Sequence, residues 1–187
     1  RKEKYENVLK NLTNISFFKG QASFIDKNKI EVNKVFLESE KFIIATGSTV
    51  SILPIEGLSQ TGFITHIEAL KLENQPKQLV IIGGGPLGLE FAQMYSRFGT
   101  KVSLLEHNTR IFSIAEPELS EKLKEILNKE NITIITRATV KRVKKFKDKK
   151  IVFYTTNNTE EQIECDEILL AAGKIANTKD LNLDKVN

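Results

Sequence analysis

Three glycines near the middle of the chain have a spacing that allows a backbone turn to approach a phosphate. They form the pattern Gly83-x-Gly85-x-x-Gly88 directly after the aliphatic run Gln78–Ile82. The first glycine permits a tight turn, the second lets the backbone approach a pyrophosphate, and the third lets the following helix pack against the strand. Pro86 suits the first position of that helix, because its φ is already helical and its missing N–H would have had no partner. The pattern predicts that a dinucleotide pyrophosphate binds at a helix N-terminus.

The residues after the glycines favour this interpretation over an ordinary glycine-rich turn, which the pattern alone does not exclude. Apolar residues at three- and four-residue spacings predict a buried helix face that ends at Gly99; they are Leu87, Leu89, Phe91, Ala92, Tyr95 and Phe98. The next predicted strand, Lys101–Glu106, ends in an acid eighteen residues beyond Gly88. Such folds place a carboxylate there to accept hydrogen bonds from an adenosine ribose.

Glu106 also bears on the choice between NAD and NADP. A carboxylate at this position would repel a 2′-phosphate, whereas sites for NADP usually offer an arginine. We therefore expect NAD. Arg110 lies four residues further on and could swing toward a 2′-phosphate, but we favour the interpretation that it is a solvated loop arginine.

The composition is that of an ordinary soluble protein. The 187 residues, 40% of them hydrophobic and 28% charged, allow one full domain and part of another. No apolar run approaches the roughly twenty residues that span a bilayer, and the basic start Arg1–Lys4 is no signal peptide. We expect a cytoplasmic protein with no membrane partner.

The single cysteine and the basic residues suggest no further chemistry. Because Cys165 is alone, the sequence excludes an internal disulfide and a thiolate metal cluster, and we interpret it as a small strand residue. The run 141–150 carries much of the net charge of +4 and could mark a nucleic-acid patch. The alternation around Val143 favours instead a hairpin with a solvated face, and we expect no nucleic-acid partner. Hydrolase and zinc motifs are absent, so we assign no catalytic residue and no metal ligand.

Three segments can be distinguished along the chain. Residues 1–51 include a short opening helix around Tyr5–Leu12 and an apolar strand over Lys41–Ser48, and they look too small to bury their own strands. Residues 52–173 carry the dinucleotide unit. Residues 174–187 have few apolar side chains and read as a stub that enters a further region.

The middle segment has the order of elements that builds a nucleotide-binding sheet. After Glu106 we predict an amphipathic helix that opens at 116–119 and runs to about Lys129. Its predicted apolar face consists of Leu119, Leu123, Ile126 and Leu127. A strand over 132–136, the basic hairpin and a last buried strand over 168–173 follow. The order β-α-β-α-β predicts an α/β fold, a Rossmann-like doubly wound parallel sheet with right-handed crossovers and an antiparallel β-hairpin insertion.

Four features occur in a recognisable order along nearly the whole chain. They are a strand that ends Ala45-Thr46-Gly47-Ser48, the block Gly-Gly-Gly-Pro-Leu-Gly-Leu-Glu at 83–90, Glu106, and a strand that ends Ala-Ala-Gly-Lys-Ile-Ala-Asn at 171–177. Together they resemble the flavoprotein disulfide reductases, the family of dihydrolipoamide dehydrogenase and mercuric reductase. The resemblance implies a central NAD-binding domain flanked by partial FAD-domain segments.

The resemblance also implies which residues contact each cofactor. For FAD these are Thr46, Gly47 and Ser48, with Ala22 near the adenosine end. For NAD the expected pyrophosphate contacts are Gly83, Gly84, Gly85, Pro86, Leu87 and Gly88. Glu106 would bind the ribose, Val140 the adenine, Gly173 the nicotinamide half and Glu90 the carboxamide. An equal alternative for Glu90 is an ordinary early-helix acid that the helix dipole favours.

The sequence also departs from the family pattern. The family usually has Gly-Arg-x-Pro-Asn where this chain has Gly173–Asn177, so a rigid proline and a bidentate arginine are missing. The FAD phosphate loop, the redox cysteine pair and the dimer domain with its His-Glu pair are also absent, and neither His66 nor His107 has the context of that base. We therefore expect this chain alone to be inactive.

These features lead to one main hypothesis and two alternatives. The main hypothesis is an NAD(H)-binding domain of an FAD-dependent oxidoreductase that passes hydride between NADH and flavin, with a homodimeric parent. The first alternative is a parent flavoprotein with a non-disulfide acceptor such as oxygen or a quinone. The second is a standalone NAD-binding module without chemistry, which the partial flavin-domain segment argues against.

Overall fold

The computed structural model describes residues 5, 8–9 and 11–186, and its contacts divide the chain into two compact units. Unit 1 comprises residues 1–49 and 176–187, and unit 2 comprises residues 50–175. The segment boundaries expected after residues 51 and 173 each lie two residues from the observed boundaries after residues 49 and 175. The opening helix expected around Tyr5–Leu12 falls partly outside the described residues. The cofactor assigned to each segment stays a prediction.

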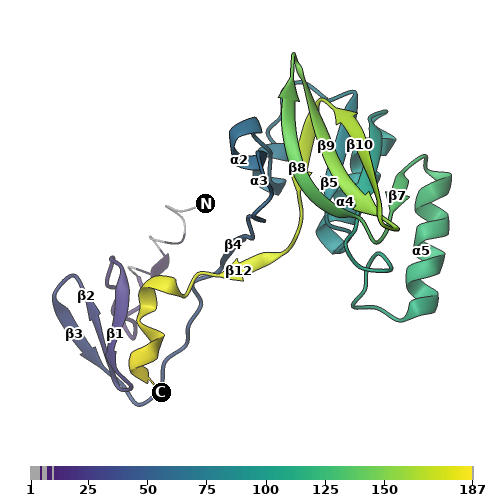
Figure 1. The fold of residues 1–187 in the computed structure, drawn as a ribbon. Helices are drawn as coiled ribbons and strands as arrows, with labels where there is room; N and C mark the ends of the chain where they lie inside the picture. The colour runs from purple at the N-terminus through teal and green to yellow at the C-terminus, as the bar shows by residue number, and fades with distance from the viewer. Residues whose placement is uncertain (1–4, 6–7, 10, 187) are drawn as a thin grey trace. The chain divides into compact units, whose positions relative to one another are not determined.

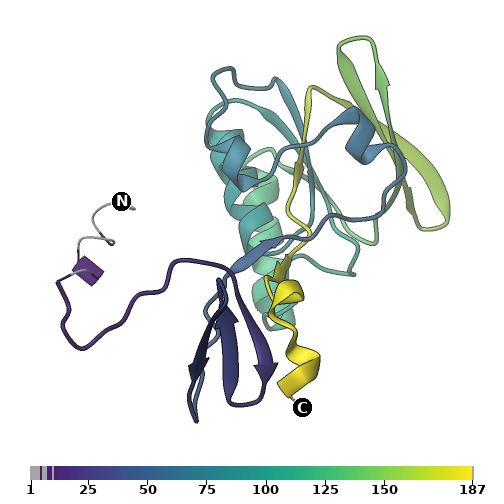
Figure 2. The same cartoon turned by 90° about the vertical axis from the view of Figure 1, so that its left-hand side faces the viewer.

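Unit 1 contains a small antiparallel sheet, visible as three neighbouring arrows in Figure 2. Its strands are β1 (Ala22–Asp26), β2 (Lys29–Val32) and β3 (Val35–Glu38), in that order. Asn33 and Lys34 both have positive φ, which is typical of the two-residue turns that join antiparallel strands. Two short 3₁₀ helices, η1 (Lys179–Leu181) and η2 (Leu183–Val186), pack near β1.

The strand predicted over Lys41–Ser48 is wrong. Residues 41–47 have no regular structure, and the short strand β4 (Ser48–Val50) begins only at the last predicted residue. Ile43 is 95% exposed. A strand needs a neighbour for its N–H and C=O groups, and none of the described residues forms a ladder with 41–47. Apolar composition alone therefore overpredicted the strand.

The centre of unit 2 is a parallel sheet of four strands (Figure 1). In spatial order they are β11 (Glu167–Leu170), β5 (Gln78–Ile82), β6 (Lys101–Leu105) and β7 (Thr133–Ile135). Helix α4 (Pro86–Arg97) joins β5 to β6, and helix α5 (Pro117–Lys129) joins β6 to β7. Two short helices, α2 (Leu58–Thr61) and α3 (His66–Ala69), precede the sheet in the chain, and the short strand β12 (Lys174–Ala176) follows it. The predicted α/β Rossmann-like fold is confirmed.

Alternation along the parallel strands gives the sheet two apolar faces. Leu79 and Ile81 of β5 belong to a core shared with α4 and α5. Val80 and Ile82 belong to a second core, shared with an antiparallel sheet on the opposite face. Both faces are therefore covered, which explains why β5 reads as an unbroken aliphatic run rather than an alternating one.

The antiparallel sheet extends the predicted basic hairpin by one strand. Its strands are β8 (Thr139–Phe146), β9 (Lys149–Thr156) and β10 (Thr159–Cys165), in the order β10-β9-β8. Val143 is buried, with half-buried Arg142 before it and exposed Lys144 after it, as the alternation predicted. The Arg142 guanidinium lies 4.3 Å from the centre of the Phe153 ring and pairs with Glu160 at 2.9 Å. Some of the basic charge is thus neutralised within the sheet.

Helix α5 begins at Pro117, with the predicted opening residue Glu116 as its N-cap, and ends at Lys129 as predicted. Its buried face is narrower than predicted. Leu127 is buried and Leu123 packs against the core, whereas Leu119 and Ile126 are 54% and 44% exposed. The reason is the position of α5 beside β7, an edge strand of only three residues, which offers little surface to cover.

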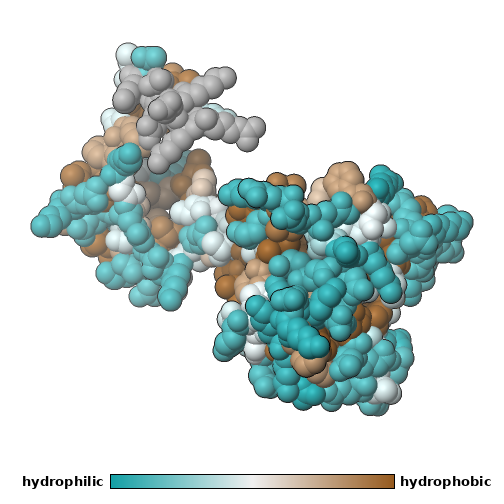
Figure 3. Space-filling model, turned by 90° about the horizontal axis from the view of Figure 1, so that it is seen from above, coloured by the Kyte–Doolittle hydropathy of each residue, from teal (hydrophilic) through white to brown (hydrophobic). Residues whose placement is uncertain are grey.

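Hydrophilic residues cover much of the face seen in Figure 3, with hydrophobic residues exposed between them. Among the residues that the structure describes, no helix is long and apolar enough to cross a membrane. The same residues contain no group of three or more His, Cys, Asp or Glu side chains that could hold a metal ion.

Asp166 links the antiparallel sheet to the parallel sheet. One carboxylate oxygen accepts the Gln78 backbone N–H at 2.8 Å, and the other accepts Lys149 Nζ at 2.6 Å. The hydrogen bond from Lys149 lowers the pKa of the Asp166 carboxyl below its ordinary value of 3.8. The ionised form is therefore favoured by folding.

We expect Asp166→Asn to destabilise the chain at neutral pH by about 1 kcal/mol or less, because the amide keeps an acceptor for Gln78 but loses the ion pair. A lowered carboxyl pKa stabilises the fold above the ordinary value and ceases to do so as the pH falls through the folded value. Urea unfolding of both proteins at pH 7 and at about pH 3 measures this. A difference that persisted unchanged at low pH would contradict the assignment to the ion pair.

Cys165 ends β10 and is fully buried, as a strand residue without a redox task should be. Burial raises the pKa of its thiol to about 12. We expect a thiol reagent at pH 8 to modify Cys165 only at the rate at which the chain unfolds, because the thiolate is the reactive form. Reaction of the folded chain at the rate of a free cysteine would contradict this; the denatured chain serves as the control.

Candidate functional site

At two of the three fingerprint positions, the turn between β5 and α4 has no space for a side chain larger than that of glycine. Gly83 has a φ of +114°, and a Cβ there would collide with the carbonyl oxygen of Ala171, the residue directly after β11. A Cβ at Gly88 would collide with the carbonyl oxygen of Gly83. These two glycines therefore let the turn close and α4 approach the sheet.

The third position has a different environment. Gly85 is the N-cap of α4, and a Cβ built there would meet no atom within 4 Å. Pro86 follows at the first helical position, and Leu89 N–H donates to Gly85 O at 3.1 Å. The N–H groups of Leu87 and Gly88 thus lack an acceptor within the helix. Because the first turn of α4 contains no acidic residue, this open end keeps its positive partial charge.

Glu106 lies directly after β6 and is only 6% exposed. Its Oε2 accepts the Gly84 N–H at 2.6 Å, and its Oε1 accepts the backbone N–H and the side-chain Nδ2 of Asn108, both at 2.7 Å. The predicted ribose acid is therefore held beside the glycine turn by donors of the protein itself. Phe112 N–H completes the contact by donating to Gly84 O at 2.8 Å.

Arg110 is half-buried rather than solvated. Its Nη2 donates to Ser113 O at 3.3 Å and to Ala115 O at 3.4 Å. Within the described residues, its buried Nε has no hydrogen-bond partner. The guanidinium is thus directed to the loop after β6.

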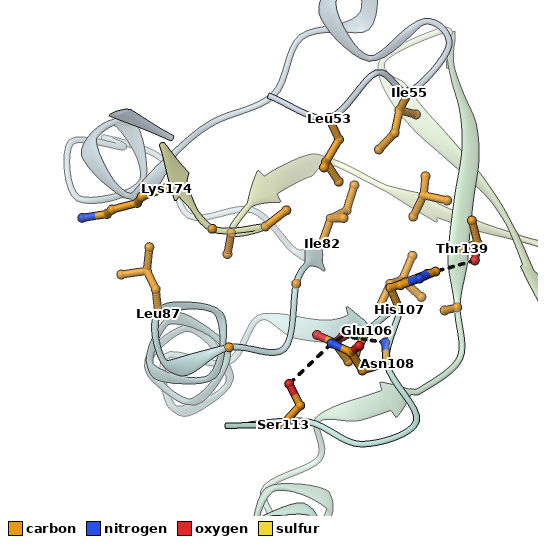
Figure 4. Close-up of a pocket in the computed structure, with 18 of the residues that line it drawn as sticks. Leu53, Ile55, Ile82, Leu87, Glu106, His107, Asn108, Ser113, Thr139 and Lys174 are labelled. Atoms are coloured by element: carbon orange, nitrogen blue, oxygen red, sulfur yellow. Dashed lines mark hydrogen bonds between the residues drawn. The ribbon is translucent and has the colours of Figure 1, made fainter. Parts of the chain in front are cut away.

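Several of these residues, among them Gly83, Gly85 and Glu106, line a cavity of about 680 Å³ in unit 2 (Figure 4). Of the predicted NAD contacts, the lining includes Gly83, Gly85, Pro86, Leu87, Glu106, Val140 and Gly173. In Figure 4, Leu87 and Lys174 lie toward one end of the cavity, and Glu106, His107 and Thr139 lie toward the other. The cavity therefore extends from the carboxyl end of β6 past the glycine turn to the carboxyl end of β11.

Three predicted NAD contacts do not line the cavity. Gly84 is buried, and its N–H donates a hydrogen bond to Glu106. Gly88 is buried against Gly83. Glu90 is exposed on α4, beyond the first turn of the helix. Its assignment to the nicotinamide carboxamide stays a prediction.

Sequence reasoning missed several lining residues. Leu53, Pro54 and Ile55 come from the loop before α2 and form an apolar wall that no motif announced. Three further lining residues follow the predicted acid: His107, Asn108 and Ser113. The hydroxyl oxygen of Thr139, which also lines the cavity, lies 3.2 Å from His107 Nδ1. The rule that ligands bind beyond the carboxyl ends of parallel strands could have pointed to the residues after Glu106. His107 lies in the loop after β6, and His66 is the first residue of α3.

The four residues expected to contact FAD all lie in unit 1. Asn177 binds two of them, because its backbone N–H donates to Gly47 O at 3.0 Å and its side-chain amide donates to Thr46 O at 3.1 Å. Ser48 begins β4, and Ala22 begins β1, where it pairs with Val32. Their role as flavin contacts stays a prediction.

Comparison with known proteins identifies the family of this chain. The family model described as pyridine nucleotide-disulphide oxidoreductase matches residues 1–187, the entire chain. The chain belongs to this family.

Several members of the pyridine nucleotide-disulphide oxidoreductase family are similar in sequence. A mercuric reductase of Lysinibacillus sphaericus is 34% identical over 98% of this chain and 33% of its own length. A dihydrolipoyl dehydrogenase of Mycoplasma genitalium is 36% identical over 90% of this chain and 37% of its own length. The chain thus spans about a third of the length of these relatives, which are oxidoreductases by name.

The fold is also shared with a solved member of the family. The Cu(II) complex of a mutant form of the HOCl-induced flavoprotein disulfide reductase RclA from Escherichia coli superposes with a TM-score of 0.84 at 29% identity. The match covers all of this chain and 42% of that one.

Substitution by alanine distinguishes a glycine that close packing requires, Gly88, from a glycine beside open space, Gly85. We expect Gly88→Ala to destabilise the chain by about 1–3 kcal/mol, because its methyl group collides with backbone. Gly85→Ala should cost less than about 1 kcal/mol, yet lower the affinity for NADH at least tenfold, because its methyl group enters the space expected for the pyrophosphate. Urea unfolding and calorimetric titration measure the two effects. Unchanged NADH affinity in Gly85→Ala would place the pyrophosphate elsewhere.

Proposed function

We propose that unit 2 binds NAD(H) and that the complete protein passes hydride between the nicotinamide and FAD as a pyridine nucleotide-disulfide oxidoreductase. The observation that carries this proposal is the open N-terminus of α4, which faces a cavity at the carboxyl ends of parallel strands with Glu106 at its side. This is where open α/β sheets bind dinucleotides.

The shape and chemistry of the cavity fit such a ligand. The glycine turn leaves free space above Gly85, and the Leu87 N–H at the open end of α4 would donate to the pyrophosphate. Val140 and Ile55 supply apolar surface for the adenine end. At the other end Gly173 has a φ of +101°, and a Cβ there would meet nothing within 4 Å, so the backbone leaves room for the nicotinamide half.

When bound, the nicotinamide would supply or accept the hydride, and the chain's own residues would hold and orient it. The apolar walls formed by Leu53, Ile55 and Ile82 would exclude water from the cofactor. In this proposal FAD contacts Thr46, Gly47 and Ser48, and the complete enzyme is a homodimer. Support for a flavin partner comes from the family and from the solved relative, which is described as a flavoprotein.

Two features support NAD over NADP. The Glu106 carboxylate would repel a 2′-phosphate. Arg110, the nearby cation that could have offset this repulsion, donates instead to the carbonyl groups of Ser113 and Ala115. A 2′-phosphate would therefore meet an acid without a compensating bidentate donor.

The proposal is tested by calorimetric titration of the chain with NADH and with NADPH, a method suited to a protein without tryptophan. We expect NADH to bind at least tenfold more tightly than NADPH. Glu106→Gln should reduce this preference, because it removes the charge. The proposal fails if neither nucleotide binds at millimolar concentration, and the preference for NAD fails if NADPH binds equally well.

Glu106→Gln should also cost stability. The amide has one oxygen, whereas the carboxylate accepts Gly84 and Asn108 donors on both of its oxygens. One buried N–H then faces an NH₂ group, so we expect a loss of about 1–3 kcal/mol. Urea unfolding measures this loss and shows whether the variant is folded under the conditions of the titration.

A further inference from the structure

We propose that Asn108 determines how the adenosine ribose is recognised. In this proposal the Asn108 side chain donates to the Glu106 carboxylate, which keeps one free acceptor site for one ribose hydroxyl. The Asn108 amide oxygen accepts the other ribose hydroxyl. The inference rests on the proposed NAD(H) site and assigns a role to a residue that the glycine fingerprint does not include.

The first step is the acceptor capacity of Glu106. Each oxygen of an ionised carboxylate can accept about two hydrogen bonds. Oε1 already accepts two, from the backbone N–H and the side chain of Asn108, and Oε2 accepts one, from Gly84 N–H. One site on Oε2 remains. A ribose offers two neighbouring hydroxyl groups, so Glu106 alone can accept only one of them.

The second step is the orientation of the Asn108 amide. Because the ionised carboxylate only accepts, the NH₂ group must face Glu106, and its distance of 2.7 Å from Oε1 agrees with that. The NH₂ group also lies 3.5 Å from Ser113 Oγ. The amide oxygen then points away from Glu106, and it has no hydrogen-bond partner within the part of the chain that the structure describes.

The third step is the position of this free oxygen. Asn108 lines the cavity beside Glu106 and Ser113, at the end expected for the adenosine (Figure 4). The ribose edge therefore meets two acceptors, Glu106 Oε2 and Asn108 Oδ1, which match two hydroxyl donors. A 2′-phosphate carries acceptor oxygens and would be opposed by both groups, so Asn108 strengthens the discrimination that the charge of Glu106 begins.

The test uses Asn108→Ala with three ligands: NADH and its analogues that lack the adenosine 2′-hydroxyl or 3′-hydroxyl. In the unmodified chain we expect removal of either hydroxyl to weaken binding about 5- to 30-fold. Asn108→Ala should weaken NADH binding by a similar factor and NADPH binding less than twofold. With one of the two deoxy analogues, the substitution should have less than a twofold effect, because the hydroxyl that Asn108 accepts is already missing.

The neighbouring Thr109→Ala is the matched control. Thr109 is exposed and does not line the cavity, so this variant should bind all ligands as the unmodified chain does. Asn108→Ala keeps the backbone N–H that donates to Glu106 but loses the side-chain hydrogen bond to that carboxylate, so its urea midpoint should fall below that of the control. The same unfolding curve shows whether the variant is folded under the conditions of the titration. Asn108→Ser provides a second truncation if the alanine variant does not fold.

The outcomes separate the two proposals. If the unmodified chain does not bind NADH, the proposed function fails. If it binds NADH but Asn108→Ala weakens NADH and both deoxy analogues equally, or weakens none of them, the role of Asn108 is overturned while the NAD(H) site stands.

Discussion

The hydrogen bond from Gly84 N–H to the buried carboxylate of Glu106 joins the glycine turn to the end of the neighbouring strand. Gly84 O is held from the same side by Phe112 N–H, so both polar groups of this one residue are bound by the segment after β6. The N–H groups in the first turn of α4 have no acceptor within the helix, so they do not stabilise the glycine turn. The acid and the loop after β6 provide that stability instead, and the position of the cavity depends on it.

The sheet beneath this turn is rigid because both of its faces are covered. Helices α4 and α5 cover one face, and the antiparallel sheet covers the other. Hydrogen bonds and ion pairs reinforce the contact between the parallel and the antiparallel sheet. Asp166 binds Gln78 and Lys149, and Lys150 binds Glu167 and the Gly62 carbonyl. These partly buried ion pairs also hydrogen-bond to the backbone, so they contribute more to the stability of the fold than exposed ion pairs do.

The sequence predicted the part of the fold in which several signals agree. The glycine spacing, the helical period after Pro86 and the acid at 106 each point to the same β-α-β unit, and the structure has it. The segment Lys41–Ser48 shows the limit, because its apolar residues carried the only signal and, among the described residues, no partner strand exists for most of it. The role proposed for Asn108 could not be inferred from spacing, because it rests on an amide orientation that the position of Glu106 determines.

The ends of unit 2 lie next to each other, since the Ser51 N–H donates to the Gly173 carbonyl at 3.0 Å. The chain thus enters and leaves this unit at nearly the same point, after completing a self-contained sheet with two cores. A segment with adjacent ends can be inserted into a loop of another protein without stretching its host. Such architecture makes unit 2, together with its proposed nucleotide site, a module that a single insertion can move between chains without rebuilding a fold.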